Sequence, residues 1–243
     1  MNKNKILILC DFDGTTCSND MGNQILNHFA KGWWEIDRSY CANEIGSRLA
    51  YLRIQPLFHG TETEMINYAL HHEKIDPHFR TFYQFCKGKG IDLKIVSDGL
   101  DFYISSVLHK HGLQEIEFYS NRVIFQNDET LSIEFPSIRN GCDRCGTCKT
   151  TILNFYREFY DHIIYVGDSY SDVCPSRIAD LVFAKPILSE KCRKNGKACI
   201  AYENFRDVRE YLGKMLEEPG GDEECSSWTF PEKRGNSQCQ ESL

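Results

Sequence analysis

Short apolar runs alternate with helix-like stretches along most of the chain, and this alternation restricts the fold more than any other feature. Each run has only three to five residues, as expected for strands that are buried on both faces. Parallel strands need long crossover connections, which the helix-like stretches supply. We therefore expect an α/β fold, in which a parallel sheet has helices on both faces. The strand-like runs are Ile6–Cys10, Asp92–Val96, Ile163–Val166, Leu181–Ala184 and Cys199–Ala201. The helix-like stretches are Phe79–Lys87, Phe102–His111, Thr150–Phe159 and Asn204–Leu216.

The segment after the first strand-like run has a different character. Between residues 17 and 77 the β pattern disappears, and stretches such as "NQILNHFAKGWWEI" and "TETEMINYALHH" have helical spacing. Thr61 and Glu64 have the spacing of a capping box, which marks the start of a helix. We therefore expect a helical cap at 17–77, inserted into a catalytic core formed by 1–16 and 78–216.

Two later segments also depart from the strand–helix alternation. In "VIFQNDETLSIEF", two strand-like runs flank Asn127 and Asp128, which predicts a small β-hairpin beside the main sheet. Residues 217–243 are polar and rich in turn-forming residues, and they hold seven acids against two bases. Because that segment has little apolar periodicity, we expect a disordered acidic tail.

Composition excludes several classes of function. The net charge of -7 comes without a broad basic patch, so we expect no nucleic-acid partner. The longest apolar runs are far too short to span a membrane, and we find no secretion signal in the first residues. Twelve cysteines in a chain of this length predict mostly free thiols in a cytoplasmic protein. The sequence leaves both a monomer and a homodimer open.

Two acids follow the first strand-like run directly. Functional groups of an open parallel sheet gather at the carboxyl ends of its strands, where Asp11 and Asp13 would lie. Two neighbouring carboxylates are tolerable when a divalent cation lies between them, and Mg²⁺ prefers such oxygen ligands. One carboxylate can then attack phosphorus, while the other protonates the leaving oxygen and later activates water. The alternative is a plain Asx-type turn closed by Gly14.

Three further positions favour the catalytic interpretation. Ser97 follows "DLKIV", where its hydroxyl and the next amides can hold an anion, although a serine there also fits a helix N-cap. After "IIYV", Asp168 can bind the metal and Asp172 can support it from behind, although Asp168 or Ser169 can also cap a helix. Lys149 can bridge the attacking carboxylate and the phosphate, or it can be a solvated surface charge. Together these residues have the order that metal-assisted phosphoryl transfer needs.

At these motifs the chain resembles the haloacid dehalogenase superfamily of phosphatases. "DFDGT" is similar to its first motif, Ser97 to its second, Lys149 to its third and "GDSYSD" to its fourth. The resemblance spans about Lys5 to Leu212, and it implies a Rossmann-like core with the small cap of the phosphoserine-phosphatase-like branch. Within that branch, "VSDGLDFYI", "CDRCGTCK" and "VGDSYSDVCPSRIADLVFAK" resemble the methionine-salvage group. Its namesake removes phosphate from 2-hydroxy-3-keto-5-methylthiopentenyl 1-phosphate.

The resemblance also implies the roles of individual residues. It makes Asp11 the nucleophile and Asp13 the general acid and base. It assigns Mg²⁺ to Asp11, Asp168 and the backbone carbonyl of Asp13. The residues implied to hold the phosphate are Ser97, Lys149, and the amides of Asp98 and Gly99.

A cysteine-rich loop lies just before Lys149. "CDRCGTCK" places Cys142, Cys145 and Cys148 at CxxCxxC spacing. Zinc takes four ligands in a tetrahedron, and nothing in the sequence nominates the fourth. Three interpretations stay open, which are a zinc site, a redox-sensitive loop, and free thiols that pack a tight loop.

The expected function is therefore a Mg²⁺-dependent phosphatase that hydrolyses a small phosphomonoester through an aspartyl phosphate. The substrate would be a methionine-salvage phosphate, or a related sugar or cofactor phosphate. One alternative is a phosphotransferase or mutase that passes the same phosphoryl group to a second substrate. Another is a non-catalytic metal-binding protein built on the CxxCxxC loop, which leaves the acid–serine–lysine–acid set unexplained.

Overall fold

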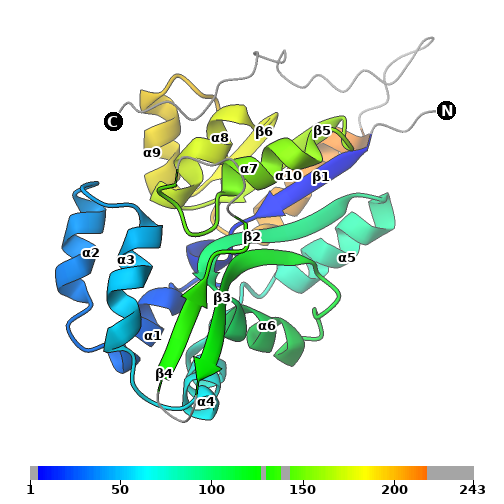
Figure 1. Cartoon of the computed structure of the whole chain (residues 1–243). Coiled ribbons are helices and arrows are strands. Elements are labelled where there is room, and N and C mark those ends of the chain that lie inside the picture. Colours follow the sequence, from blue (N-terminus) through cyan, green and yellow to red (C-terminus); the bar gives the residue numbers. More distant parts are fainter. Residues whose placement is uncertain (1–4, 127–129, 138–142, 218–243) are drawn as a thin grey trace, which may run out of the picture.

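A mostly parallel sheet forms the centre of the molecule (Figure 1). This computed structural model describes residues 5–126, 130–137 and 143–217. Within them a seven-stranded sheet has the order β4-β3-β2-β1-β5-β6-β7, and every neighbouring pair is parallel except β3 and β4. The strands are β1 Ile6–Cys10, β2 Asp92–Leu100, β3 Phe118–Gln126, β4 Thr130–Glu134, β5 His162–Gly167, β6 Leu181–Ala184 and β7 Ile200–Ala201. Of the predicted tail 217–243, Glu217 is the last residue of a helix, whereas the residues from 218 onward and the turn at Asn127–Asp128 lie outside the described residues.

Helices cover both faces of this sheet, as the alternation predicted. Figure 1 shows α5, α6 and α10 on one side, and α7, α8 and α9 on the other. These helices are α5 Phe79–Lys89, α6 Asp101–Lys110, α7 Lys149–Tyr156, α8 Val173–Ile178, α9 Pro186–Lys194 and α10 Phe205–Glu217. Among the described residues, each helix is too short or too polar to cross a membrane.

The central strand β1 is apolar throughout because both of its faces are buried. Ile6, Ile8 and Cys10 belong to the core beneath α5, α6 and α10. Leu7 and Leu9 belong to the separate core beneath α7 and α9. Because successive side chains of a strand point to opposite faces, a strand covered on both sides needs apolar residues at every position. Its carboxyl end therefore opens into the crevice between two layers, directly before Asp11.

The insert after β1 is helical, as predicted from its spacing. Its helices are α1 Met21–Phe29, α2 Trp34–Cys41, α3 Ser47–Ile54 and α4 Glu62–His72, with a short helical turn at Gln55–Leu57. The capping box predicted at Thr61 and Glu64 is present at the start of α4. Cys17 pairs with Ile75 in an isolated antiparallel bridge, so the chain leaves and rejoins the core at neighbouring points. This bridge supports the cap boundaries of 17–77, which stay a prediction.

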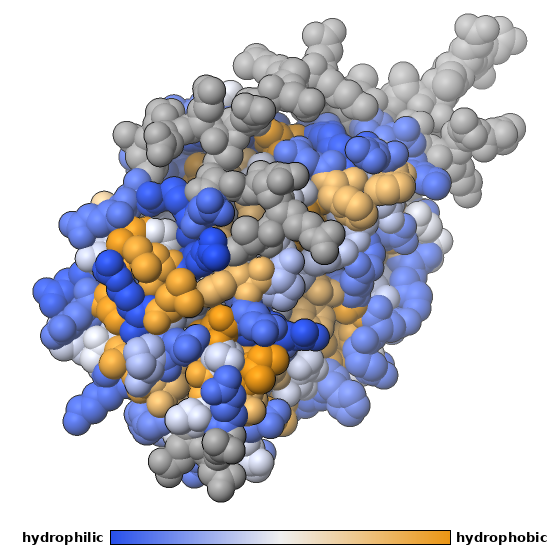
Figure 2. Space-filling model, viewed as in Figure 1, coloured by the Kyte–Doolittle hydropathy of each residue, from blue (hydrophilic) through white to orange (hydrophobic). Residues whose placement is uncertain are grey.

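The outer face of the cap carries apolar side chains. Trp34, Leu49 and Leu52 are exposed on α2 and α3. Figure 2 shows apolar groups gathered among hydrophilic ones over this part of the molecule.

Two strand boundaries differ from the sequence expectations. The hairpin of β3 and β4 continues the main sheet, because Phe118 and Tyr119 pair with Ile95 and Val96 of β2. Strand β2 runs on to Leu100 after an irregularity in its pairing with β3. The segment with Ser97 thus lies inside the irregular part of a strand, where the ladder is interrupted.

Candidate active site

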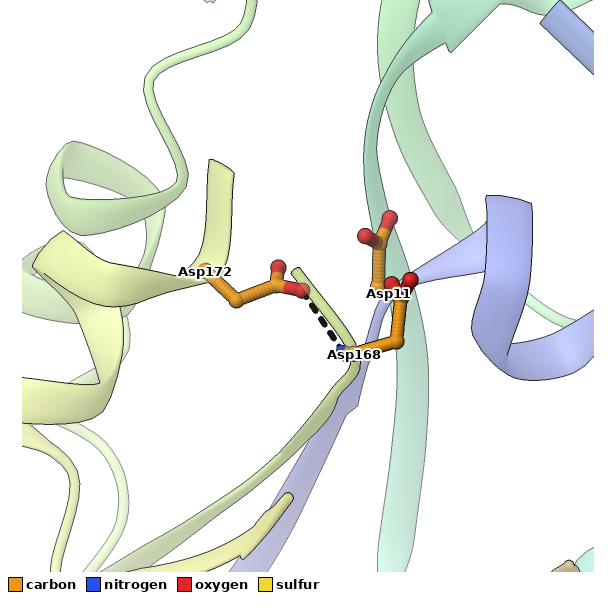
Figure 3. A group of neighbouring side chains, drawn as sticks. All are labelled: Asp11, Asp168 and Asp172. Atoms are coloured by element: carbon orange, nitrogen blue, oxygen red, sulfur yellow. Dashed lines mark hydrogen bonds between the residues drawn. The ribbon is translucent and has the colours of Figure 1, made fainter. Parts of the chain in front are cut away.

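Three carboxylates meet at the carboxyl edge of the sheet. Asp11 follows β1 and Asp168 follows β5, and these strands are paired neighbours, with Cys10 opposite Val166. Asp172 reaches the same place from the short helical turn Tyr170–Asp172. One ligand oxygen from each aspartate lies within 4.8 Å of the other two (Figure 3). The fold therefore brings Asp11 to two acids that lie 157 and 161 positions later in the sequence.

The turn Phe12–Thr16 lets the acids approach one another. Asp11 Oδ1 accepts a hydrogen bond from the Phe12 amide at 2.7 Å, which is one residue on, whereas an Asx-type turn uses the amide two residues on. Gly14 has a positive φ of 72°, and a Cβ there would overlap the Asp168 carboxylate. Glycine is therefore required both by the backbone conformation and by the close approach of Asp168. The turn and the carboxylate cluster are two aspects of one arrangement.

Asp172 is fully occupied by hydrogen-bond donors. Its Oδ1 accepts from Lys149 Nζ at 2.7 Å and from the Tyr165 hydroxyl at 2.6 Å. Its Oδ2 accepts from the amides of Asp168 at 2.9 Å and Ser169 at 3.1 Å. Burial alone would raise the pKa of Asp172, but the charge and hydrogen bond of Lys149 hold it below its usual value. Its carboxylate thus fixes the backbone that carries Asp168, and it has little capacity left for a metal.

Lys149 is buried at the first position of α7, so it is not a solvated surface charge. Its Nζ lies 2.7 Å from Asp11 Oδ2 and 2.7 Å from Asp172 Oδ1, and it also donates to Ser171 Oγ at 2.9 Å. Burial disfavours the ammonium, but the charges of Asp11 and Asp172 raise the pKa of Lys149. The side chain therefore stays charged between the two carboxylates.

The remaining charge favours a bound cation. Burial and the neighbouring Asp172 raise the pKa of Asp11, although Lys149 opposes the shift. Burial and Asp172 also raise the pKa of Asp168, to about 7. The raised pKa values mean that Asp11 and Asp168 ionise fully only if more positive charge is nearby. A hard divalent cation, which prefers carboxylate oxygens as ligands, would supply that charge. The oxygen donors of Asp11 and Asp168 fit such an ion.

Asp13 is held between the core and the cap. Its Oδ1 accepts from the amides of Met21 at 2.7 Å and Gly22 at 3.3 Å, at the start of α1. Its Oδ2 accepts from the Tyr103 hydroxyl at 2.5 Å. Burial and the nearby Asp20 raise the pKa of Asp13 to about 7, against the effect of these hydrogen bonds. Such a shift brings the pKa of this carboxyl group close to neutral pH.

The predicted phosphate-binding segment lies in the irregular part of β2. Ser97 is buried, and its Oγ accepts from the Gly99 amide at 3.0 Å. The carboxylate of Asp98 accepts from Ser47 Oγ, and its Oδ1 also accepts from the Thr147 amide at 2.8 Å. The side chain of Asp98 is therefore a structural link between β2, the start of α3 and the loop before Lys149.

The cap touches the core at the loop before Lys149. A Cβ at Gly46 would overlap the carbonyl of Arg144, so the backbones meet closely there. The Arg48 amide donates to that carbonyl at 3.1 Å. Ser47 Oγ also accepts from the Gly146 amide at 3.1 Å. The first turn of α3 thus joins the cap to the loop that positions Lys149 and to the segment with Ser97.

The cysteine loop is described only in part. Cys148 is buried and accepts a hydrogen bond from Thr151 Oγ1 at 3.2 Å, whereas Cys142 lies outside the described residues. Within the described part of the chain, the three aspartates are the one group of metal-ligating side chains close enough to share an ion. The zinc, redox and packing interpretations therefore stay predictions.

We expect the loop to need its thiols for packing and not for metal. Replacing Cys142, Cys145 and Cys148 together by serine should perturb the loop before Lys149 but leave the phosphatase chemistry in place. Turnover and the zinc content of purified protein, measured by mass spectrometry, test this. Stoichiometric zinc in the wild-type protein that is lost in the triple variant would contradict the packing interpretation.

Several residues of the site escape the sequence motifs. Tyr103 contacts Asp13, Tyr165 contacts Asp172, and Lys185 Nζ donates to the Gly14 carbonyl at 2.6 Å. Lys185 had a usable signal, because it directly follows strand β6 at the same edge of the sheet as Asp11 and Asp168. Tyr165 is the one aromatic residue in the run "IIYV". Tyr103 has no comparable signal, since a tyrosine in an amphipathic helix is an ordinary core residue.

Known proteins match this chain over most of its length. The family model described as Putative Phosphatase matches residues 6–186. The 2-hydroxy-3-keto-5-methylthiopentenyl-1-phosphate phosphatase of Brevibacillus brevis is 30% identical over 221 residues, which cover 88% of this chain and 98% of the relative.

Solved structures share the fold. A phosphoserine phosphatase structure, described as a phospho-aspartyl intermediate analogue, has a TM-score of 0.67 at 21% identity, covering 86% of this chain and 99% of its own. A HAD family hydrolase from Salmonella enterica has a TM-score of 0.67 at 18% identity, covering 86% and 72%. The chain therefore belongs to the Putative Phosphatase family, and the curated relatives that it matches are phosphoric monoester hydrolases.

Proposed function

We propose that this protein hydrolyses a small phosphate monoester through an aspartyl phosphate on Asp11, with Mg²⁺ as its cofactor. One observation carries the proposal. Lys149 is buried with its ammonium 2.7 Å from Asp11 Oδ2, at an edge of the sheet where Asp168 and Asp172 converge. A purely structural ion pair between Lys149 and Asp11 would not need two further carboxylates beside it.

In the first step, the Asp11 carboxylate attacks phosphorus and the ester P–O bond breaks. Asp13, in its protonated form, gives its proton to the leaving oxygen. In the second step, Asp13 takes a proton from water as the water oxygen attacks phosphorus, and Asp11 is released. This exchange of roles fits a carboxyl group whose pKa of about 7 allows both forms.

The phosphoryl group needs positive and hydrogen-bonding partners during both steps. We assign these to Lys149, to the Ser97 hydroxyl and to the backbone amides of Asp98 and Gly99. Donors that are fixed before the reaction stabilise the developing charge without reorganisation. The Asp98 side chain supports this, because its hydrogen bonds hold the segment in place.

Asp11, Asp168 and the backbone carbonyl of Asp13 would hold Mg²⁺. When bound, the ion neutralises the carboxylates and draws charge from the phosphate. Asp172 would act behind them by fixing the backbone of Asp168, since donors occupy both of its oxygens.

The substrate that we propose is a small phosphate ester, in the first place the methionine-salvage phosphate named for the Brevibacillus relative, or else a related sugar or cofactor phosphate. The helical segment 17–77 would act as a cap that excludes bulk water above Asp11. We propose a cytoplasmic enzyme, monomeric or homodimeric, that binds neither nucleic acid nor membrane.

Metal removal tests the proposal directly. Protein stripped with EDTA should fail to hydrolyse an aryl phosphate, and adding Mg²⁺ should restore release of inorganic phosphate, because the clustered acids need a cation. Free phosphate measured in water without an added acceptor also distinguishes a hydrolase from a phosphotransferase. Full activity in verifiably metal-free protein would contradict the mechanism.

A further inference from the structure

The carboxyl group of Asp13 has partners of two chemical kinds. Oδ1 faces the amides of Met21 and Gly22, which can only donate hydrogen bonds. Oδ2 faces the Tyr103 hydroxyl at 2.5 Å, and a hydroxyl both donates and accepts. A proton on Oδ1 would take one of its two acceptor sites, so at least one of these two hydrogen bonds would be lost. A proton on Oδ2 costs neither of them, because the hydroxyl can rotate.

We propose that Tyr103 is a positioning residue that keeps the transferable proton of Asp13 on Oδ2, an inference that rests on the proposed function. With the carboxylate form, the Tyr103 hydroxyl donates to Oδ2. With the acid form, the hydroxyl accepts from Oδ2–H until the substrate oxygen takes its place. The same oxygen then gives its proton to the leaving group in the first step and receives one from water in the second.

The surroundings of Tyr103 hold the hydroxyl in this place. The side chain is fully buried on α6, and its ring packs against Phe12 and Phe102 at centroid distances of 6.0 Å and 5.5 Å. A Cβ at Gly99 would overlap the hydroxyl, and one at Gly22 would lie 3.4 Å from it. Gly99 thus leaves the space that the hydroxyl fills, and Gly22 lies at contact distance on the side of the cap.

The Tyr103→Phe variant separates positioning from packing, because it removes one oxygen and keeps the ring. Without the hydroxyl, Oδ2 loses its partner and the carboxyl group can turn away from the reacting oxygen. We expect an alkyl phosphate, whose leaving oxygen needs protonation, to form the aspartyl phosphate about 10-fold or more slowly. An aryl phosphate needs little protonation, so its first step should stay within about 2-fold, whereas hydrolysis of the intermediate should slow about 10-fold or more.

Rapid acid quench measures both steps as the burst of phosphoenzyme and the later release of phosphate. Tyr160→Phe is the matched control, since the Tyr160 hydroxyl donates to Asp92 Oδ2 at 2.6 Å at the opposite end of β2. This control should change neither step. An equal slowing of both steps with the aryl ester in Tyr103→Phe, or no change with either ester, would overturn the inference.

A double-mutant cycle keeps the test decisive if packing also changes. In an Asp13→Asn background, Tyr103→Phe should have no further effect on either step, because the group that it positions is gone. The same fold-loss in both backgrounds would show that Tyr103 acts independently of Asp13. The burst of phosphoenzyme in the wild-type protein distinguishes failure of the proposed function from failure of this inference. If the wild-type protein gives no burst, the aspartyl phosphate mechanism is wrong. If it gives a burst and Tyr103→Phe has no effect, only the role of Tyr103 is wrong.

Discussion

An Asp11→Asn variant should form neither phosphoenzyme nor inorganic phosphate, with turnover lowered by a factor on the order of 10⁴ or more. The amide has the shape of the carboxylate and can still accept the hydrogen bond from the Phe12 amide. It has no anionic oxygen with which to attack phosphorus. The variant also loses the ion pair of Asp11 Oδ2 with Lys149, so some loss of stability is expected beside the loss of chemistry. Thermal unfolding measured beside the assay separates the two, because turnover should be lost at temperatures where the variant is still folded.

Asp13→Asn is the control that distinguishes the two acids of the turn. It keeps Asp11 and the backbone carbonyl of residue 13, but it removes the group that exchanges protons. With an aryl phosphate, the aspartyl phosphate should form and then hydrolyse about 10²- to 10⁴-fold more slowly. Acid quench and peptide mass spectrometry should find phosphate on Asp11. Phosphate on Asp13 would reverse the assigned roles.

Lys149→Met should have the largest effect on stability. Removing one partner of a buried ion pair leaves charge without compensation, which typically costs about 3–5 kcal/mol. In the wild-type protein Lys149 depresses the pKa of Asp172, so Asp172 contributes stability that is lost as the pH falls. Without the ammonium, burial should raise the pKa of Asp172 above its unfolded value and should raise further the pKa of Asp11, which is already raised in the wild-type protein, so stability is lost as the pH rises. The difference between the two proteins should therefore be small near pH 4 and grow toward pH 8.

Urea unfolding of both proteins across that pH range measures the difference. Lys87→Met is the matched control, because the ion pair of Lys87 with Glu115 is about half exposed on both sides. Solvent screens such a pair, and its removal should change stability little at any pH. A Lys149→Met difference that is constant with pH would mean that packing, and not charge, explains the loss.

The sequence predicted those parts of the site that lie next to strands. Asp11 and Asp168 each follow a strand of the parallel sheet directly, and a parallel sheet brings such positions to one edge. Periodicity locates strands, so it also locates these ends. Lys185 obeys the same rule after β6, and it was missed because a lone lysine suggests a surface charge.

Contacts between distant elements could not be predicted in the same way. Tyr103 and Asp13 are 90 positions apart, and Ser47 and Asp98 are 51 positions apart. These contacts depend on how the cap and α6 pack over the sheet. Tyr103 and Ser47 each fit the residue pattern of their own helix, so neither stands out in the sequence. The full length of β2 could not be predicted for a related reason. Its pairing with β3 is interrupted after Val96 and resumes at Leu100, which depends on the position of β3 in the sheet.

The junction of α3 with the loop before Lys149 has a consequence for the rate at which the protein binds its substrate. Separating α3 from this loop and from β2 would break three hydrogen bonds, which are those of Ser47 with Asp98 and Gly146 and that of the Arg48 amide with Arg144, besides the ion pair of Arg48 with Asp143. At about 0.5–1.5 kcal/mol each, these three bonds favour the joined state by roughly 10- to 1,000-fold. If a phosphate ester can enter only when α3 and the loop are separated, roughly 0.1–10% of the protein molecules are able to bind it at any moment. Its apparent association rate would fall to that fraction of the intrinsic rate, whatever the rate of chemistry at Asp11.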